Sequence, residues 1–240
     1  MKRDAKELLK ASLNEMNIEV DNDICDSFME YSRLLRKWNE VMNLTAITDE
    51  EEIVIKHFAD SVSALKAMDI EENATALDIG TGAGFPGLPV KIVRPDIKMT
   101  LVDSLNKRVN FLKAVCEELK LEDIECIHAR AEELSRKADK RESFDYCLSR
   151  AVASLNVLCE YCLPFVKVGG HLIALKGPNA VNEVEDAKKA IDVLGGKLVE
   201  IKDISIPYSD FKHNLVIIKK VKQTPSVYPR KGSNISKKPL

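Results

Sequence analysis

The sequence lacks the features that mark several classes of protein. No stretch of about 18 uncharged apolar residues occurs, so no membrane span is predicted. With 10 glycines, 9 prolines, 5% aromatic, 45% hydrophobic and 31% charged residues among 240, the chain is not collagen-like, disordered or a disulfide scaffold. The first residues carry no apolar segment of a secretory signal, and we therefore expect a cytoplasmic protein.

Cysteine is scarce and scattered. Only Cys159 and Cys162 have the CxxC spacing, and neither a second pair nor a suitably spaced histidine accompanies them. The others lie mostly in apolar runs, where cysteine behaves as a small hydrophobic residue. The sequence thus predicts reduced cysteines and no metal site.

Charge is nearly balanced overall but uneven along the chain. Lys and Arg total 36, Asp and Glu total 38, and the net charge is -2. From Phe211 to the end there are eight basic and no acidic residues, whereas residues 1–70 contain nine basic and fifteen acidic ones. A basic end is typical of a surface that meets a phosphate backbone, and equally of a solvated tail.

Hydrophobic spacing changes its period near residue 70. Helices are predicted at 5–16, 22–42, 48–68, 86–93, 106–119, 131–137, 155–166 and 179–194, and strands at 74–79, 97–102, 124–127, 144–148, 171–175, 197–201 and 214–220. Alternating strands and helices predict an α/β fold with a mostly parallel sheet covered on both faces, and the last two strands predict an antiparallel edge. We expect a helical extension over 1–70, a Rossmann-like domain over 71–222 and a basic tail over 223–240.

A glycine-rich segment follows the first predicted strand and precedes a helix, which is the context of a nucleotide-type loop. It contains Gly80, Gly82 and Phe85. Twenty-three residues after Gly80, Asp103 ends the second strand, where a carboxylate can accept hydrogen bonds from both ribose hydroxyls of an adenosine. The pattern predicts an adenosine cofactor across the first strand–helix–strand unit.

Asp78, two residues before the first glycine, bears on which cofactor this is. Placed at the strand end and facing the site, its carboxylate would repel a pyrophosphate and suit the cationic S-adenosylmethionine. The residues favour that cofactor over a dinucleotide, although the spacing of Gly82, Gly84 and Gly87 also fits a dinucleotide fingerprint or a purely structural loop.

Charged residues follow three later strands, at the edge of the sheet where ligands bind. Ala131 and Glu132 follow the third strand and can contact an adenine edge, or simply begin a helix. Arg150 follows the fourth strand and Lys176 the fifth; they are candidates for orienting the substrate, with a structural ion pair and an ordinary turn as the alternatives.

Several motifs together resemble the bacterial RsmG methyltransferases, also called glucose-inhibited division protein B. The resemblance spans roughly residues 34–240. It rests on Asn43-Leu-Thr-Ala-Ile47, His57-Phe-Ala-Asp-Ser61, the 78–89 glycine segment, Leu101-Val-Asp-Ser-Leu105, Arg130-Ala-Glu132, Ser149-Arg-Ala-Val152, Ala174-Leu-Lys-Gly177, Tyr228-Pro-Arg-Lys231 and Lys237-Lys-Pro-Leu240.

The resemblance implies transfer of a methyl group from S-adenosylmethionine to N7 of a guanine in small-subunit ribosomal RNA, on the free RNA or the 30S subunit. It implies cofactor contacts from Gly80, Phe85, Ala131, Glu132 and Arg150. Guanine N7 carries a lone pair and no proton, so no catalytic base is expected.

Further substrate contacts are expected from outside the glycine loop. Asn43 and His57 are candidates for the base pocket, with a helix end and a surface histidine as their structural alternatives. Tyr228, Arg230 and Lys231 suit base stacking and phosphate contact. We expect a monomer with no obligate protein partner. An NAD(P)-dependent oxidoreductase and a non-catalytic RNA-binding module are the competing hypotheses.

Overall fold

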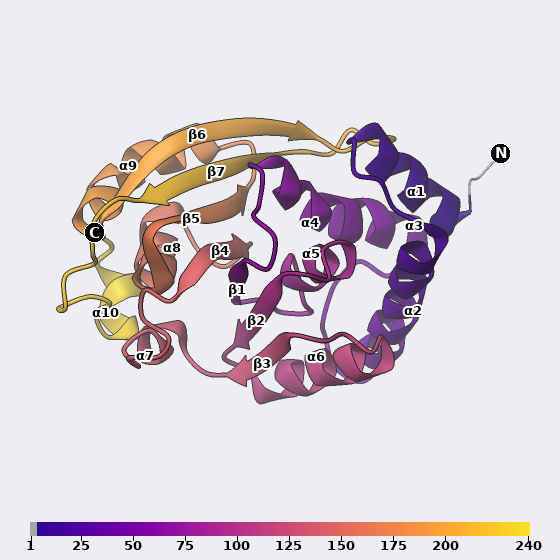
Figure 1. The fold of residues 1–240 in the computed structure, drawn as a ribbon, viewed down its shortest axis with the longest axis horizontal. Coiled ribbons are helices and arrows are strands. Elements are labelled where there is room, and N and C mark those ends of the chain that lie inside the picture. The colour runs from indigo at the N-terminus through magenta and orange to yellow at the C-terminus, as the bar shows by residue number, and fades with distance from the viewer. Residues whose placement is uncertain (1–3) are drawn as a thin grey trace.

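The computed structural model describes residues 4–240, which form a seven-stranded sheet with helices on both faces (Figure 1). The strands are β1 (Thr75–Ile79), β2 (Lys98–Asp103), β3 (Ile124–His128), β4 (Phe144–Arg150), β5 (Val166–Lys176), β6 (Gly196–Ser205) and β7 (Lys212–Lys220). Their order is β3-β2-β1-β4-β5-β7-β6. Neighbours from β3 to β5 are parallel, and β7 is antiparallel to β5 and β6. The predicted fold class and antiparallel edge are confirmed.

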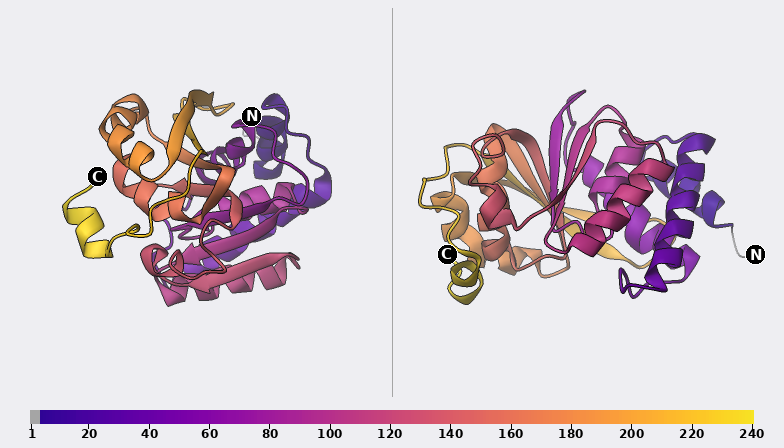
Figure 2. Two further views of the ribbon diagram at one scale, coloured as in Figure 1. Left: turned by 60° about the vertical axis from the view of Figure 1, so that its left-hand side comes forward. Right: turned by 90° about the horizontal axis from the view of Figure 1, so that it is seen from below.

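Helices cover the two faces of the sheet because successive strand residues point in opposite directions. The helices after the first strand are α5 (Gly87–Val93), α6 (Asn106–Glu118), α7 (Ala131–Leu134), α8 (Leu155–Cys162), α9 (Ala180–Val193) and α10 (Gly232–Lys237). Leu148 and Ile173 pack in the cluster that contains α5 and α6, whereas Cys147 and Leu172 pack in the cluster that contains α8 and α9. Figure 2 shows these helices on opposite sides of the sheet.

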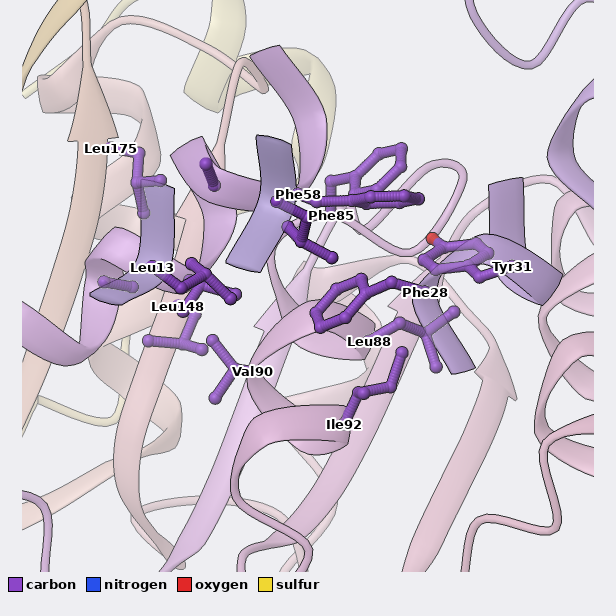
Figure 3. Packing of buried hydrophobic residues seen from close by; sticks show 14 of the residues in the cluster. Leu13, Phe28, Tyr31, Phe58, Phe85, Leu88, Val90, Ile92, Leu148 and Leu175 are labelled. Carbon is purple, nitrogen blue, oxygen red and sulfur yellow. The ribbon is translucent and has the colours of Figure 1, made fainter. Parts of the chain in front are cut away.

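Residues 4–70 contain a series of helices that pack against the core of the sheet domain. They are α1 (Ala5–Glu15), α2 (Asn22–Asn39), α3 (Glu50–Ile53), a π-helix (Val54–Ala59), α4 (Asp60–Val62) and a 3-10 helix (Ser63–Lys66). Phe28 and Phe58 from this segment lie in one hydrophobic cluster with Leu88 and Leu148 of the sheet domain (Figure 3). The helical extension thus packs as a layer on one face of the sheet, while its boundary at residue 70 stays a prediction.

The helix predicted over 48–68 differs from the observed structure. Asp49, not Thr48, caps it by accepting a hydrogen bond from the N–H of Glu52, and a π-helical turn then interrupts it. A π-turn inserts one extra residue and shifts the faces of the two flanking segments relative to each other. Here the turn carries His57, and Asp60 follows it directly.

Two other predicted boundaries moved for local reasons. The helix predicted to end at 42 ends at Asn39, whose Oδ1 accepts hydrogen bonds from the N–H groups of Leu44 and Thr45 and folds the chain back. The helix predicted to end at 166 ends at Cys162 because Pro164 cannot continue an α-helix. Among residues 4–240, no helix is long and apolar enough to cross a membrane.

Candidate cofactor and substrate site

The glycine loop after β1 depends on left-handed backbone conformations. Gly80, Gly82 and Gly84 have φ angles of 70°, 62° and 102°. The N–H of Gly82 donates to Oδ2 of Asp103 at 3.0 Å, so the loop is tied to the end of β2. A Cβ added at Gly80 would lie 2.5 Å from Cγ2 of Val152, which shows how closely the chain after β4 approaches the loop.

A cavity of about 190 Å³ opens beside this loop, at the carboxyl ends of the strands. We call it the cofactor cavity; it is lined by Ile79, Gly80, Val102, Asp103, Ser104, Ala129, Arg130, Ala131, Glu132, Val152 and Tyr161. Four residues predicted to contact the cofactor therefore lie together here: Gly80, Asp103, Ala131 and Glu132. Gly82 and Phe85 do not line it.

The residues of the cofactor cavity fit an adenosyl group. Asp103 accepts hydrogen bonds from the N–H of Gly82, from the N–H of Leu105 at 2.8 Å and from Nη1 of Arg108 at 3.4 Å, which fixes its carboxylate. A carboxylate offers about four acceptor positions, so capacity remains for a ribose hydroxyl. Asp103 and Glu132 give this cavity two carboxylates against one cation, Arg130, whose side chain is largely exposed.

Asp78 does not lie where the sequence predicted it. Its side chain is fully buried, and its Oδ2 accepts hydrogen bonds from the Thr81 hydroxyl at 2.6 Å and the Gly87 N–H at 2.8 Å. Burial raises the pKa of this carboxyl to about 6. Asp78 therefore supports the glycine loop from beneath, and the expectation that it faces the ligand is wrong because the loop folds over it.

A second cavity of about 480 Å³ lies at the ends of β4 and β5. We call it the substrate cavity; it is lined by Ile47, Lys56, His57, Asp60, Arg150, Ala151, Leu175, Lys176, Gly177, Pro178, Glu183, Phe211, Lys212 and His213. His57, Arg150 and Lys176 are thus brought together as predicted. Asn43 is exposed and is not among the lining residues; the turn that contains it is organised by Asn39 instead.

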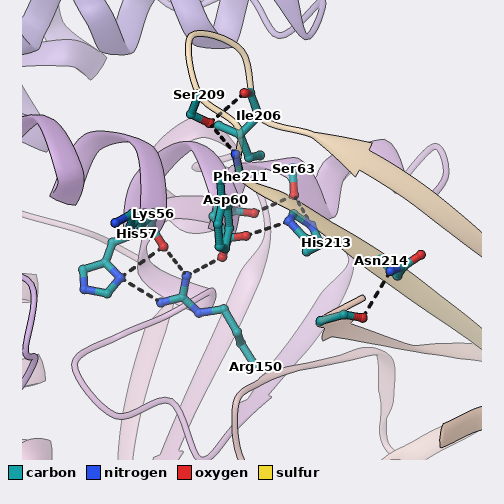
Figure 4. A network of polar contacts seen from close by, with 11 residues as sticks. Lys56, His57, Asp60, Ser63, Arg150, Ile206, Ser209, Phe211, His213 and Asn214 are labelled. Carbon is teal, nitrogen blue, oxygen red and sulfur yellow. Dashed lines mark hydrogen bonds and ion pairs between the residues drawn. The ribbon is translucent and has the colours of Figure 1, made fainter. Parts of the chain in front are cut away.

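Arg150 reaches from the end of β4 into a set of acceptors on the N-terminal helices (Figure 4). Its Nη1 donates to the carbonyl of Lys56 at 3.0 Å and to Oδ2 of Asp60 at 2.5 Å. Its guanidinium carbon lies 4.9 Å from the centre of the Phe85 ring, within the range of a cation–π contact. Arg150 and Phe85, both predicted cofactor contacts, therefore meet beside the substrate cavity.

His57 is held as a neutral ring. Its Nδ1 lies 3.2 Å from the carbonyl oxygen of Lys56 and 3.3 Å from Nη2 of Arg150. Its Nε2 lies 2.7 Å from the Thr45 hydroxyl. Burial, with the charge of Arg150, lowers the pKa of His57 to about 4. The ring also stacks on Phe85 with centroids 4.5 Å apart.

Sequence reasoning missed the partners beneath Arg150. Oδ1 of Asp60 lies 2.8 Å from Nδ1 of His213 on β7, and Nε2 of His213 lies 3.1 Å from the Ser63 hydroxyl. The three-residue spacing of His57 and Asp60 places them on one helical face and was the available signal for Asp60. No local signal indicates His213, because it lies 150 residues after Ser63 in the chain.

Lys176 is anchored within its own surroundings. Its Nζ donates to the Ala153 carbonyl at 2.5 Å and to Oε2 of Glu183 at 2.7 Å. The lysine thus joins the end of β5 to α9 and to the segment after β4. Most of these contacts are those of an ordinary strand-to-helix turn, which was the alternative to a substrate-orienting role for Lys176.

The C-terminal tail is fastened to the domain by arginines. Arg230 pairs with Glu160 on α8 through Nη2 at 2.6 Å and Nε at 3.0 Å, and Glu160 is fully buried. Arg141 donates to the carbonyls of Thr224 and Tyr228. Arg230 is thus held mainly by its pair with Glu160, whereas Tyr228 is half-buried and Lys231 is exposed, and the RNA-binding role of these three residues stays a prediction.

The segment from Arg150 to Val152 separates the two cavities. Arg150 and Ala151 line the substrate cavity, and Val152 lines the cofactor cavity. Ala151 has a φ of 55°, which is the left-handed region.

The comparisons with known proteins agree with this architecture. A sequence model described as "GidB: rRNA small subunit methyltransferase G" matches residues 24–215. "Ribosomal RNA small subunit methyltransferase G" of Alkaliphilus metalliredigens is 52% identical over 237 residues, which are 99% of each chain. Its namesake in Clostridium perfringens is 52% identical over 234 residues, which are 98% of each chain.

Solved structures show the same fold at low sequence identity. TrmN from Thermus thermophilus has a TM-score of 0.52 and 16% identity, covering 70% of this chain and 53% of that chain. A SAM-dependent methyltransferase from Aquifex aeolicus has a TM-score of 0.51 and 18% identity, covering 76% and 97%. These likenesses support the Rossmann-like methyltransferase fold, and the sequence match over four-fifths of the chain shows that it belongs to the GidB family, rRNA small subunit methyltransferase G.

Proposed function

We propose that this protein transfers a methyl group from S-adenosylmethionine to N7 of a guanine in small-subunit ribosomal RNA. The observation that carries the proposal is the near-complete, 52% identical match to proteins named ribosomal RNA small subunit methyltransferase G. The structure supports it with two adjoining cavities at the carboxyl edge of the sheet, one suited to an adenosyl group and one to a base.

Four residues would hold the cofactor. Asp103 would accept from a ribose hydroxyl, Gly80 leaves room for close approach, and Ala131 and Glu132 form the opposite wall. When bound, S-adenosylmethionine supplies a methyl group on a positively charged sulfur. We expect the acidic groups of the cavity to favour that cation.

The substrate cavity suits a reaction that needs alignment and no proton removal. Guanine N7 offers its lone pair directly, so the residues around it have to orient the base and exclude water. Ile47, Leu175 and Phe211 provide apolar walls for a base that is splayed from an RNA loop. His57 remains uncharged, which avoids adding a cation next to a purine that gains positive charge.

A labelling experiment tests whether the protein transfers a methyl group and to which atom. The enzyme is incubated with labelled S-adenosylmethionine and with undermethylated small-subunit ribosomal RNA or 30S subunits, and the position of the label is mapped. Label on one guanine N7 is expected. Absence of label from every form of the RNA would overturn the proposal in favour of a non-catalytic RNA-binding module.

Calorimetry with S-adenosylhomocysteine and with NAD separates the proposal from an oxidoreductase. We expect binding of the first compound only, and we expect Asp103→Ala to weaken it by about 1.5–3 kcal/mol, the scale of lost charge-assisted hydrogen bonds. Because Asp103 also holds the loop, Lys98→Ala at the opposite end of β2 serves as the control and should bind normally. Tight NAD binding alone would contradict the proposal.

We also infer that the protein acts in the cytoplasm as a monomer, where it would meet its RNA substrate. Size-exclusion chromatography with light scattering tests the oligomeric state. A mass near 26.8 kDa is expected, and a stable dimer would contradict the inference.

A further inference from the structure

A third cavity, of about 480 Å³, lies between α7 and the C-terminal tail. Four basic residues and two acidic residues line it, together with Gly232 and Ser233. The charged residues are Arg130, Arg136, Arg230, Lys231, Glu132 and Glu133. We call it the tail groove. It adjoins the cofactor cavity because Arg130 and Glu132 line both.

The cations of the tail groove fall into two groups. Arg230 is paired with the buried Glu160, and Arg136 donates to the carbonyl of Pro229, so both hold the tail in place. Arg130 and Lys231 are exposed, and the Arg130 side chain is 68% accessible with a weak contact of 4.0 Å to Glu132. Arg136 is exposed as well and keeps its charge, but its bond to the tail fixes its position, so Arg130 and Lys231 are the two cations of the groove that make no close contact.

The two acids do not cancel this charge equally. Glu132 is only 11% exposed and is packed against Gly232, where an added Cβ would lie 2.1 Å from its Oε1. Glu133 is exposed and is the more accessible of the two acids to an anion in the groove. The tail beyond Thr224 contains four basic residues and no acidic residue, so the surroundings add positive charge.

We propose that the tail groove binds the sugar-phosphate backbone of the substrate RNA, with Arg130 and Lys231 contacting phosphates next to the transfer site. The inference rests on the proposed function for the identity of the RNA. A phosphate chain fits because its charge complements the groove, and because the shared Arg130 places that chain beside the cofactor cavity. Because the tail is already held against the domain, its backbone does not have to lose conformational entropy when the RNA binds.

The experiment measures binding of a fluorescent in vitro transcript of small-subunit ribosomal RNA at several salt concentrations. Loss of one phosphate contact on single-stranded RNA lowers the salt slope by about 0.7, which is roughly fivefold in affinity at 0.1 M salt. The double variant Arg130→Gln/Lys231→Gln should therefore bind roughly 25-fold more weakly, with a shallower slope.

Two further variants distinguish an effect of charge on RNA binding from a loss of folded protein. Glu133→Gln should tighten binding, because it removes the opposing charge, and no loss of structure would do that. Lys98→Gln removes an exposed cation at the amino end of β2, on the far edge of the sheet, and should leave binding unchanged. Equal affinity and salt slope for the double variant and the wild type would overturn the inference.

Methyl transfer by the wild type is measured on the same RNA so that the two proposals fail separately. Binding with the expected charge dependence but without methylation would leave the groove assignment standing and remove the proposed function. Methylation with a double variant of unchanged affinity would do the opposite.

Discussion

Arg150 and Asp60, 90 residues apart in the chain, form a nearly buried ion pair with Nη1 and Oδ2 2.5 Å apart. The pair joins the end of β4 to the N-terminal helices, so the helical layer and the sheet share one site. Because Asp60 also contacts His213 on β7, a single carboxylate connects three parts of the fold.

Asp60→Asn should cost about 3–5 kcal/mol of unfolding free energy, since it leaves the largely buried Arg150 charge without a carboxylate partner. Urea denaturation measures this. The exposed ion pair of Lys6 and Asp26 provides the control, and Asp26→Asn should cost about 0–1 kcal/mol. Similar losses of unfolding free energy in the two variants would show that the Asp60–Arg150 pair stabilises the fold no more than an exposed ion pair does.

The Asp60 effect should also depend on pH. Burial raises the pKa of Asp60, but the hydrogen bond from His213 and the Arg150 charge outweigh it, and the net pKa is lowered. A carboxyl with a lowered folded-state pKa contributes stability above its unfolded pKa, about 3.9, and loses it as the pH falls further. The difference between wild type and Asp60→Asn should therefore be constant above pH 5 and shrink below pH 4.

His57 should not titrate in the methyl-transfer reaction. Its pKa of about 4 keeps the ring neutral throughout the pH range in which the enzyme is assayed. The shape of the rate profile between pH 5.5 and 8 should be the same for wild type and His57→Gln, whatever the absolute rates. An inflection near pH 6.5 that disappears in the variant would show that the ring ionises after all.

Asp78 should make the protein less stable as the pH rises from about 4 to 6. Its pKa of about 6 in the folded state exceeds the unfolded value, so over this range the folded protein retains a proton that the unfolded chain releases. Asp78→Asn abolishes this titration and should flatten the decline, as followed by urea unfolding at each pH. A decline of the same size in the variant would mean that Asp78 has an ordinary pKa.

Ala151→Gly should stabilise the protein by about 0.5–1 kcal/mol. The left-handed conformation costs a non-glycine residue about 1–2 kcal/mol, and the larger unfolded-state entropy of glycine offsets part of the gain. Ala153→Gly, two residues later and without a positive φ, should instead lose about 0.5–1 kcal/mol. Equal changes at both positions would show that Ala151 is not strained.

Local patterns located all seven strands because each contains a short apolar run, although β5 begins at Val166 and not at 171, and β6 ends at Ser205 and not at 201. The same patterns predicted residues 48–68 as one helix, since a π-turn uses the same helix-forming residues and is selected by the packing of Phe58 and the contacts of His57 and Asp60. Arg230 and Lys231 are adjacent cations in the sequence, and only the fold brings Glu160 to the first of them.

Asp78 and Asp103 show what the sequence determines and what only the tertiary structure determines. Both end or nearly end a strand before a turn, and the sequence by itself determined that acids, glycines and helices would alternate at one edge of an α/β sheet. The tertiary structure decided that Asp103 lines a cavity and that Asp78 is covered by its own loop. It did so because burial and hydrogen bonding of a side chain depend on neighbours that are distant in the chain, whereas local conformation depends on adjacent residues.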